Sequence, residues 1–247
     1  MDVVWLHDED FDSIGDAIRE KLDTETEYKL GQMTPAIDSI PTPNCDVDKI
    51  IDGTITEVYL PGIDRINRYV FNGCTELTSV TAPEVTRLGQ STFENCTSLI
   101  NINIPELTRA DTYTFRNCTS LVSVEFPNLI TIDNNLFESC TNLTSIFVPN
   151  LTSIGYYSFR NCSLLNNLVF PNITSIMNGA FQNCTSLTSL TIYTNSVCTL
   201  NNVDAFNDTP IASGTGYIYV PAELVDSYKA ATNWSTYASQ IVAIPSE

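Results

Sequence analysis

Apolar residues return along this chain at a fixed interval of 22 residues, from about residue 55 to residue 192. In one unit, Val80 and Ala82 alternate with polar neighbours, which is typical of a strand with one buried face. Pro83 then ends the strand, a second short extended segment follows at 85–88, and a single helical or 3₁₀ turn is expected before Cys96. A fixed period of this length predicts a stacked-repeat solenoid, because one unit alone cannot bury its apolar face.

Each unit is called a coil here, and equivalent positions in successive coils form a column. Three columns keep the period without slippage: Phe71, Phe93, Phe115, Phe137, Phe159 and Phe181; Cys74, Cys96, Cys118, Cys140, Cys162 and Cys184; and Pro61, Pro83, Pro105, Pro127, Pro149 and Pro171. A last, degenerate coil starts at Leu187 and reaches Phe206 three residues late, without its cysteine. The prediction is therefore a regular array that ends in an altered coil.

The repeated motif Phe-x-Asn-Cys-Thr-Ser-Leu, at 93–99 and 181–187, resembles the BspA-type leucine-rich repeat family. The resemblance covers about residues 54–192. It implies a curved parallel-sheet solenoid and an association with cell-surface adhesion and protein recognition. Residues 217–228 with Asn233 and Trp234 are similar to the usual end of such arrays. Their pattern predicts a strand and then a helix begun at Pro221, covering the last coil.

The first 43 residues have a different pattern. Apolar residues that share one helical face lie at Phe11, Ile14, Ile18 and Leu22, and a second short helix would carry Met33, Ile37 and Ile40. Residues 14–21 and 31–40 resemble a helical module of tailed-phage structural proteins. The expected domains are a helical module with its linker at 1–43, the leucine-rich-repeat solenoid at 44–192, and the degenerate coil with an α/β cap at 193–247.

The cysteine column is expected to hold buried free thiols, because stacked equivalent positions place small side chains one above another. Disulfide bonding between alternate cysteines is the alternative that Cα distances leave open. Cys45 and Cys198 lie outside the column. A metal site is not expected, since the chain has one histidine, His7, and no Cys-x-x-Cys pair.

The formal net charge is −18, and acidic residues concentrate before residue 53. Such a balance repels phosphate backbones and anionic membrane surfaces, so nucleic acid is not an expected partner. No signal peptide is visible and no run of apolar residues is long enough for a membrane span. We expect an extracellular-surface or virion-associated location, with cytoplasmic synthesis without ordinary secretion as the alternative.

One candidate binding surface lies on the outward strand positions. One column reads Thr81, Asn103, Glu125, Phe147, Val169 and Thr191, and its neighbour reads Ser79, Asn101, Ser123, Ser145, Asn167 and Ser189. Phe147 and Val169 would form an apolar pair beside Glu125 on a polar sheet, which is a candidate contact patch. Incidental surface apolarity is the alternative.

Two further columns carry charge. Arg65, Arg87 and Arg109 share one column, so they need nearby acids, such as Asp64, Asp111 and Asp133, or an anionic ligand. The other column alternates in sign and predicts a row of exposed ion pairs of small energy: Glu94, Arg116, Glu138 and Arg160.

Catalysis has no support in the sequence, since no phosphate loop, calcium loop or marked general acid occurs. The expected function is non-enzymatic, without a cofactor: recognition of a protein or glycan by the solenoid surface, with phage or prophage tail association. A bacterial adhesin of the BspA type is the alternative, and an unrecognised hydrolase is a third. The oligomeric state is not indicated.

Overall fold

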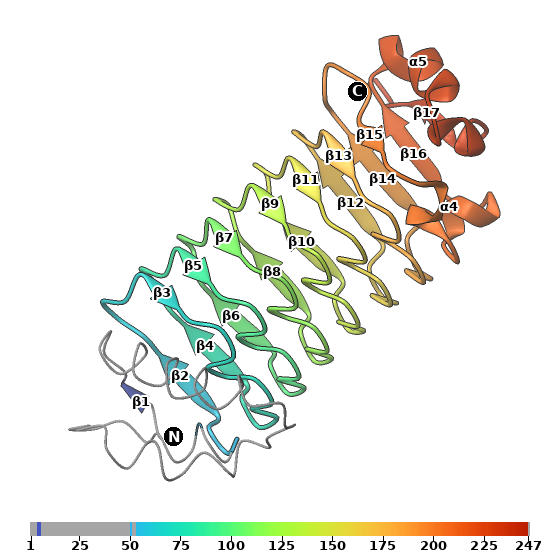
Figure 1. Ribbon diagram of the computed structural model, residues 1–247. Coiled ribbons are helices and arrows are strands. Elements are labelled where there is room, and N and C mark those ends of the chain that lie inside the picture. The colour runs from blue at the N-terminus through green and yellow to red at the C-terminus, as the bar shows by residue number, and fades with distance from the viewer. Residues whose placement is uncertain (1–3, 6–49, 51–52, 247) are drawn as a thin grey trace.

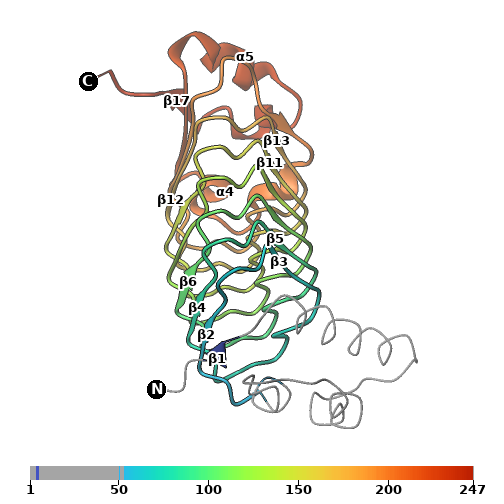
Figure 2. The ribbon, with the colours of Figure 1, turned by 90° about the vertical axis from the view of Figure 1, so that its left-hand side faces the viewer.

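The computed structural model describes residues 4–5, 50 and 53–246, and the account that follows concerns these residues. The chain winds into coils that stack along one axis and end in a C-terminal cap (Figure 1). Each coil contributes one strand to each of two rows, which lie on opposite sides of the stack (Figure 2). The predicted leucine-rich-repeat solenoid is confirmed.

The long-strand row holds three- and four-residue strands. They are β2 (Glu57–Tyr59), β4 (Ser79–Thr81), β6 (Asn101–Asn103), β8 (Ser123–Glu125), β10 (Ser145–Phe147), β12 (Asn167–Phe170), β14 (Ser189–Ile192), β16 (Tyr217–Val220) and β17 (Ile241–Ala243). The short-strand row holds two-residue strands. They are β3 (Arg65–Ile66), β5 (Arg87–Leu88), β7 (Arg109–Ala110), β9 (Thr131–Ile132), β11 (Ser153–Ile154), β13 (Ser175–Ile176) and β15 (Thr199–Leu200).

The strand pairings are parallel, and those between successive coils join equivalent positions. Val80, for example, lies opposite Val58 on one side and Ile102 on the other. The long-strand row consists of three hydrogen-bonded sheets, with breaks between β6 and β8 and between β10 and β12, and the short-strand row consists of two, with a break between β7 and β9. Because side chains alternate between the two faces of a strand, the apolar side chain of each pair points inward and its neighbours point outward. The columns read from the sequence are therefore real lines of side chains along the molecule.

The core lies between the two rows. Val80, Leu88 and Leu99 are fully buried, and so are their equivalents in most coils. The phenylalanine column forms a continuous stack in which adjacent ring centroids lie 5.3–5.7 Å apart, from Phe71 to Phe206. Phe206 joins this stack although it comes three residues late, because two of the extra residues lie between β14 and β15 and the third lies between β15 and Phe206.

The segment before each cysteine was predicted as a single helical or 3₁₀ turn, and the structure shows a hydrogen-bonded turn there that does not extend into a helix. The Cys96 amide donates to the Phe93 carbonyl at 3.1 Å, which is a three-residue spacing. Left-handed backbone on both sides breaks the segment, with φ of 55° at Ser91 and 63° at Asn95. Asparagine tolerates this conformation better than most residues, which explains its column. The Asn117 side-chain amide also donates to the Asn95 side-chain oxygen at 2.8 Å.

The six column cysteines are buried and form no disulfide bond, and the same holds for Cys198. The prediction of buried thiols is confirmed for the six column positions. Cys45 lies outside the described residues.

The C-terminal cap adds five short helical segments: η2 (Val203–Phe206), α4 (Pro210–Ser213), η3 (Ala222–Leu224), α5 (Val225–Ala230) and η4 (Trp234–Tyr237). The predicted strand and helix around Pro221 are present as β16 and as η3 followed by α5. Trp234 covers the end of the phenylalanine stack, 6.1 Å from the Phe206 ring, and its indole nitrogen donates to the Cys198 carbonyl at 2.6 Å. The cap therefore closes the last coil, as expected.

At the other end, β1 (Val4–Trp5) pairs in parallel with β2, placing Val4 opposite Val58. The N-terminal segment thus adds a strand to the sheet, which the helical pattern did not predict. The expected helices at 11–40, the linker at 41–44 and the resemblance to a phage module lie outside the described residues.

Candidate binding surfaces

The outward positions of the long-strand row form the first candidate surface. Phe147 is 53% exposed and Val169 is 56% exposed, and they hold the same column position in adjacent coils. Phe147 lies opposite Glu125 in the β8–β10 pair, and Glu125 is exposed as well. The three residues predicted to form a patch are thus neighbours on an accessible face.

The same face carries three tyrosines that the repeat period did not predict. Tyr219 lies opposite Thr191 and so continues the column of Phe147, while Tyr217 lies opposite Ser189 in the neighbouring column. Their ring centroids are 6.2 Å apart. Tyr193 lies one coil after Pro171, in the column that holds proline in the earlier coils, and it is 51% exposed.

Together, five side chains define what is called the aromatic face below: Phe147, Val169, Tyr193, Tyr217 and Tyr219. They lie on the C-terminal half of the long-strand row, Phe147 on the β8–β10 sheet and the others on or directly after strands of the sheet formed by β12, β14, β16 and β17. Small polar residues surround them, and the Ser189 hydroxyl donates to the Asn167 side-chain oxygen at 2.7 Å. The surface thus combines accessible rings with fixed amide and hydroxyl groups.

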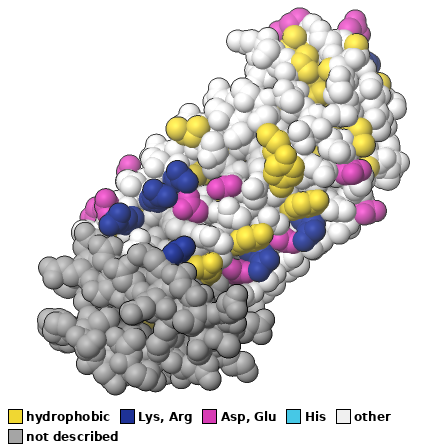
Figure 3. Space-filling view, in the orientation of Figure 1, with side chains coloured by type: hydrophobic (Ala, Val, Ile, Leu, Met, Phe, Trp, Pro, Cys, Tyr) yellow, Lys and Arg dark blue, Asp and Glu magenta, His cyan; other side chains and the backbone are white. Residues whose placement is uncertain are grey.

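The arginine column lies on the other row. The Asp111 carboxylate accepts from Arg109 at 2.7 Å and from Arg87 at 3.3 Å, so one acid bridges two coils. The predicted neutralisation is confirmed for Asp111. The Asp133 carboxylate instead accepts from the Asn134 backbone amide at 2.7 Å. Arg65 lies opposite Arg87 in the parallel register. On the face seen in Figure 3, the basic side chains concentrate toward the N-terminal coils.

The alternating charge column differs from its prediction. Arg116 pairs with Glu94 and Arg160 pairs with Glu138, but among the residues that the structure describes these two pairs are not joined to each other. The glutamate side chains are only 8% exposed, so the expectation of exposed pairs is wrong on the acidic side. Each arginine also lies over a tyrosine ring, 4.5 Å from Tyr113 in one case and 4.8 Å from Tyr157 in the other.

This arrangement repeats every second coil. Tyr113 and Tyr157 share one column, in which the alternate coils have Ser91 and Asn135. Gly179 occupies the same column position one coil after Tyr157, and a Cβ atom at Gly179 would lie 2.3 Å from the Tyr157 ring. Each tyrosine ring therefore needs a smaller residue at the same column position one coil later. As a result, this column repeats every two coils, whereas the core columns repeat every coil.

The repeat pattern has a match among known protein families. The model described as the BspA type leucine rich repeat region (6 copies) matches residues 52–165 and 108–217. The chain belongs to this family. No curated protein matches the BspA-type chain.

Solved leucine-rich-repeat structures resemble it. A leucine rich repeat protein of T. pallidum is 28% identical, with a TM-score of 0.52, over 57% of this BspA-type chain and 74% of that one. A leucine rich cell surface protein of Faecalibacterium prausnitzii is 20% identical with a TM-score of 0.45, over 67% and 60% of the two chains. A leucine-rich repeat protein of Bacteroides ovatus is 17% identical with a TM-score of 0.39, over 67% and 63%. The BspA-type chain spans less than two thirds of the last two proteins.

Two further properties bear on the function of this BspA-type protein. Among the described residues, no group of three or more His, Cys, Asp or Glu side chains could hold a metal ion. Along the same stretch of chain, no helix is long and apolar enough to cross a membrane.

Proposed function

We propose that this BspA-type protein is a non-catalytic recognition protein whose aromatic face binds a protein or glycan ligand. The observation that carries the proposal is the alignment of these side chains in one column. The parallel register joins Val169 to Tyr219 through Thr191, and Phe147 holds the same repeat position one coil before Val169. Phe147 and Val169 are exposed, and Tyr219 is half-buried. Exposed aromatic anchors held on a rigid sheet supply much of the binding energy in recognition sites.

A glycan fits this face better than a globular protein does. The apolar side chains form two groups, Phe147 with Val169 and Tyr217 with Tyr219, and Thr191 and Ser189 lie between the groups. The centre of a protein interface is instead a contiguous apolar patch. A sugar ring has an apolar face that packs on an aromatic ring and hydroxyls that reach amide and hydroxyl groups beside it. Asn167 and Ser189 supply such groups next to Val169 and Tyr217.

The experiment is a glycan array and a protein pull-down with the full chain, followed by affinity measurement for whichever ligand binds. Phe147→Ala and Tyr219→Ala should each weaken binding by about 1 kcal/mol or more. Ile130→Ala is the matched control, because Ile130 is 52% exposed but is not part of the aromatic face. Normal binding by Phe147→Ala, with loss of binding in Arg87→Ala combined with Arg109→Ala, would place the ligand on the arginine column instead.

The setting of this activity is proposed from two resemblances. The family resemblance favours a cell-surface adhesin. The resemblance of residues 14–40 to a phage module favours attachment to a virion or prophage tail. Neighbouring genes distinguish them: tail genes support the second setting, and sortase or secretion genes support the first.

A further inference from the structure

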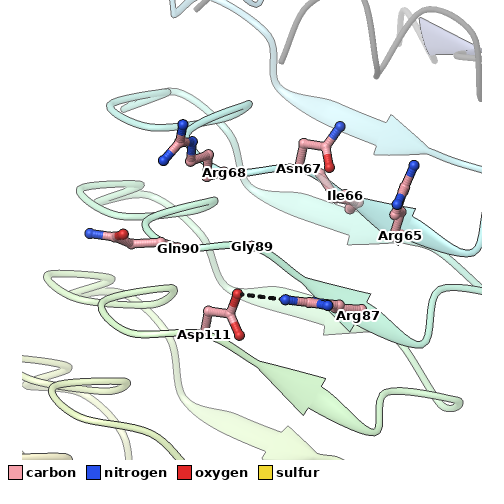
Figure 4. Close-up of a pocket in the computed structure, with 8 residues that line it drawn as sticks. All are labelled: Arg65, Ile66, Asn67, Arg68, Arg87, Gly89, Gln90 and Asp111. Carbon is pink, nitrogen blue, oxygen red and sulfur yellow. Dashed lines mark hydrogen bonds and ion pairs between the residues drawn. The ribbon is translucent and has the colours of Figure 1, made fainter. Parts of the chain in front are cut away.

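The short-strand row carries two hollows of the same construction. The first, of about 440 Å³, is drawn in Figure 4 and is lined by Arg65, Ile66, Asn67, Arg68, Arg87, Gly89, Gln90 and Asp111. The second, of about 340 Å³, lies three coils further along. Each residue that lines the first hollow has an equivalent three coils later that lines the second. Arg65 corresponds to Thr131, for example, and Asp111 corresponds to Met177.

A glycine lies in the wall of each hollow, where the backbone of the preceding coil comes close to it. Gly89 follows β5, and a Cβ atom there would lie 2.5 Å from the Arg68 backbone nitrogen of the preceding coil. Gly155 follows β11, and a Cβ atom there would lie 2.8 Å from the Asn134 backbone nitrogen. Other coils have a side chain at this position, such as Asp111. The two glycines therefore allow a close approach of adjacent backbones and add no side chain to the hollow that each of them lines.

The two hollows differ in charge. Three arginines border the first, Arg65, Arg68 and Arg87, against the single carboxylate of Asp111. At the equivalent positions the second has Thr131, Asn134 and Ser153. Arg68 is exposed and makes no ion pair with any residue that the structure describes. The second hollow is also lined by one arginine, Arg109, and one carboxylate, Asp133, so more arginines line the first hollow than the second.

We propose that the hollow over Gly89 binds an oxyanion, a carboxylate, sulfate or phosphate group carried by a ligand of about the size of a monosaccharide. A guanidinium group matches such oxygens with two parallel N–H donors. Figure 4 shows Arg68 and Gln90 near one end of the hollow, and Arg87 extended toward Asp111. A volume of this size is typical of small-molecule sites.

The Arg87–Asp111 contact does not prevent this binding. It is 3.3 Å long with the arginine half exposed, and such surface pairs contribute only about 0–1 kcal/mol. Asp111 keeps its shorter contact with Arg109 when Arg87 turns to a ligand. Arg87 can therefore exchange partners at small cost.

The test uses the full chain with sodium sulfate, sodium acetate and glucuronate as probes and glucose as the neutral comparison. Binding is followed by backbone amide shifts and by calorimetry at low and high sodium chloride. We expect saturable shifts at Gly89 and Gln90, none at Gly155 and Tyr156, no response to glucose, and weaker binding at high salt. Sulfate binding without glucuronate binding would identify the ligand group as a sulfate or phosphate.

Arg68→Gln combined with Arg87→Gln should lower the affinity at least tenfold. Lys229→Gln is the control for loss of a positive charge, because Lys229 lies in α5 of the C-terminal cap, away from the hollow and from Asp111. It should change affinity less than twofold. Unchanged affinity in the double variant, equal shifts at Gly155, or no saturable binding would overturn the proposal. Phe147→Ala should bind these probes normally, so the test is independent of the aromatic face.

Discussion

The thiol of Cys118 donates a hydrogen bond to the backbone carbonyl oxygen of Phe93, 3.1 Å away in the preceding coil. The same contact joins Cys96 to Phe71 and Cys184 to Phe159, each at 3.0 Å. Each cysteine is therefore a small buried side chain that also supplies a donor to the coil before it. This explains why phenylalanine and cysteine keep the same register throughout the array.

Buried, hydrogen-bonded thiols should resist modification. In native protein, a thiol reagent should label none of the six column cysteines, whereas in denaturant it should label all six, because burial excludes the reagent and disfavours the thiolate. Peptide mass mapping of the labelled sites separates these six from Cys45. Detection of disulfides between column cysteines, or fast native labelling of Cys118, would contradict the expectation.

The same burial makes stability depend on alkaline pH. Burial raises the pKa of Cys184 and of Cys198 to about 12, and raises the pKa of Cys96, Cys118 and Cys162 well above the usual value. The stabilisation is complete below the unfolded pKa near 8.5. Above it the unfolded chain loses protons that the folded chain keeps, so the free energy of unfolding falls with rising pH.

The expected slope approaches about 1.4 kcal/mol per pH unit for each titrating thiol. Urea unfolding between neutral pH and about pH 10.5 measures it. Cys184→Ala should reduce the slope by the share of one thiol, which provides the control. A free energy of unfolding that stays constant across this range would refute the prediction.

The buried carboxylate of Glu138 should depend on Arg160. The Arg160 Nε atom donates to Glu138 at 2.8 Å, and the carboxylate also accepts from the Asn135 side-chain amide at 2.7 Å. Arg160→Met leaves a nearly buried charge without its cation and should lower the free energy of unfolding by about 1–3 kcal/mol. Glu138→Gln added to Arg160→Met should restore part of the loss in chemical denaturation. An Arg160→Met variant with an unchanged free energy of unfolding would show that the pair does not stabilise the fold.

Deleting residues 1–42 removes β1 from the edge of β2. In a repeat array each coil contacts only its neighbours, so the loss should be confined to the first coil and the melting temperature should fall little. Hydrogen exchange should become faster in β2 and stay unchanged in β8. An insoluble or unfolded truncation would instead show that the deleted segment is needed as a cap.

The solenoid and its inward columns were predictable from the sequence because a strict period and alternating strands fix which side chains share a line. The aromatic face was predictable only as far as Phe147 and Val169. Tyr219 continues their column 28 residues after Thr191, where the one-coil period is lost and only strand pairing identifies the partner. The burial of Glu94 was not predictable either, because it depends on the positions that the Arg116 side chain and its turn adopt in the next coil. The hollow over Gly89 needed knowledge of how closely adjacent backbones approach.

The two-coil alternation of Glu94, Arg116, Glu138 and Arg160 limits how such a chain can change length during evolution. Duplication of a single coil would preserve the core columns but would place two like charges at adjacent positions of the charge column. When the copied coil carries Glu94 or Glu138, one of the two nearly buried glutamates would have no arginine partner. It would also interrupt the alternation of tyrosine with smaller residues in the column of Tyr113 and Tyr157. Duplication of two adjacent coils preserves both ion pairs and both rings. Selection on charge should therefore favour BspA-type arrays of this pattern that grow by pairs of coils, even though their hydrophobic core would accept one coil at a time.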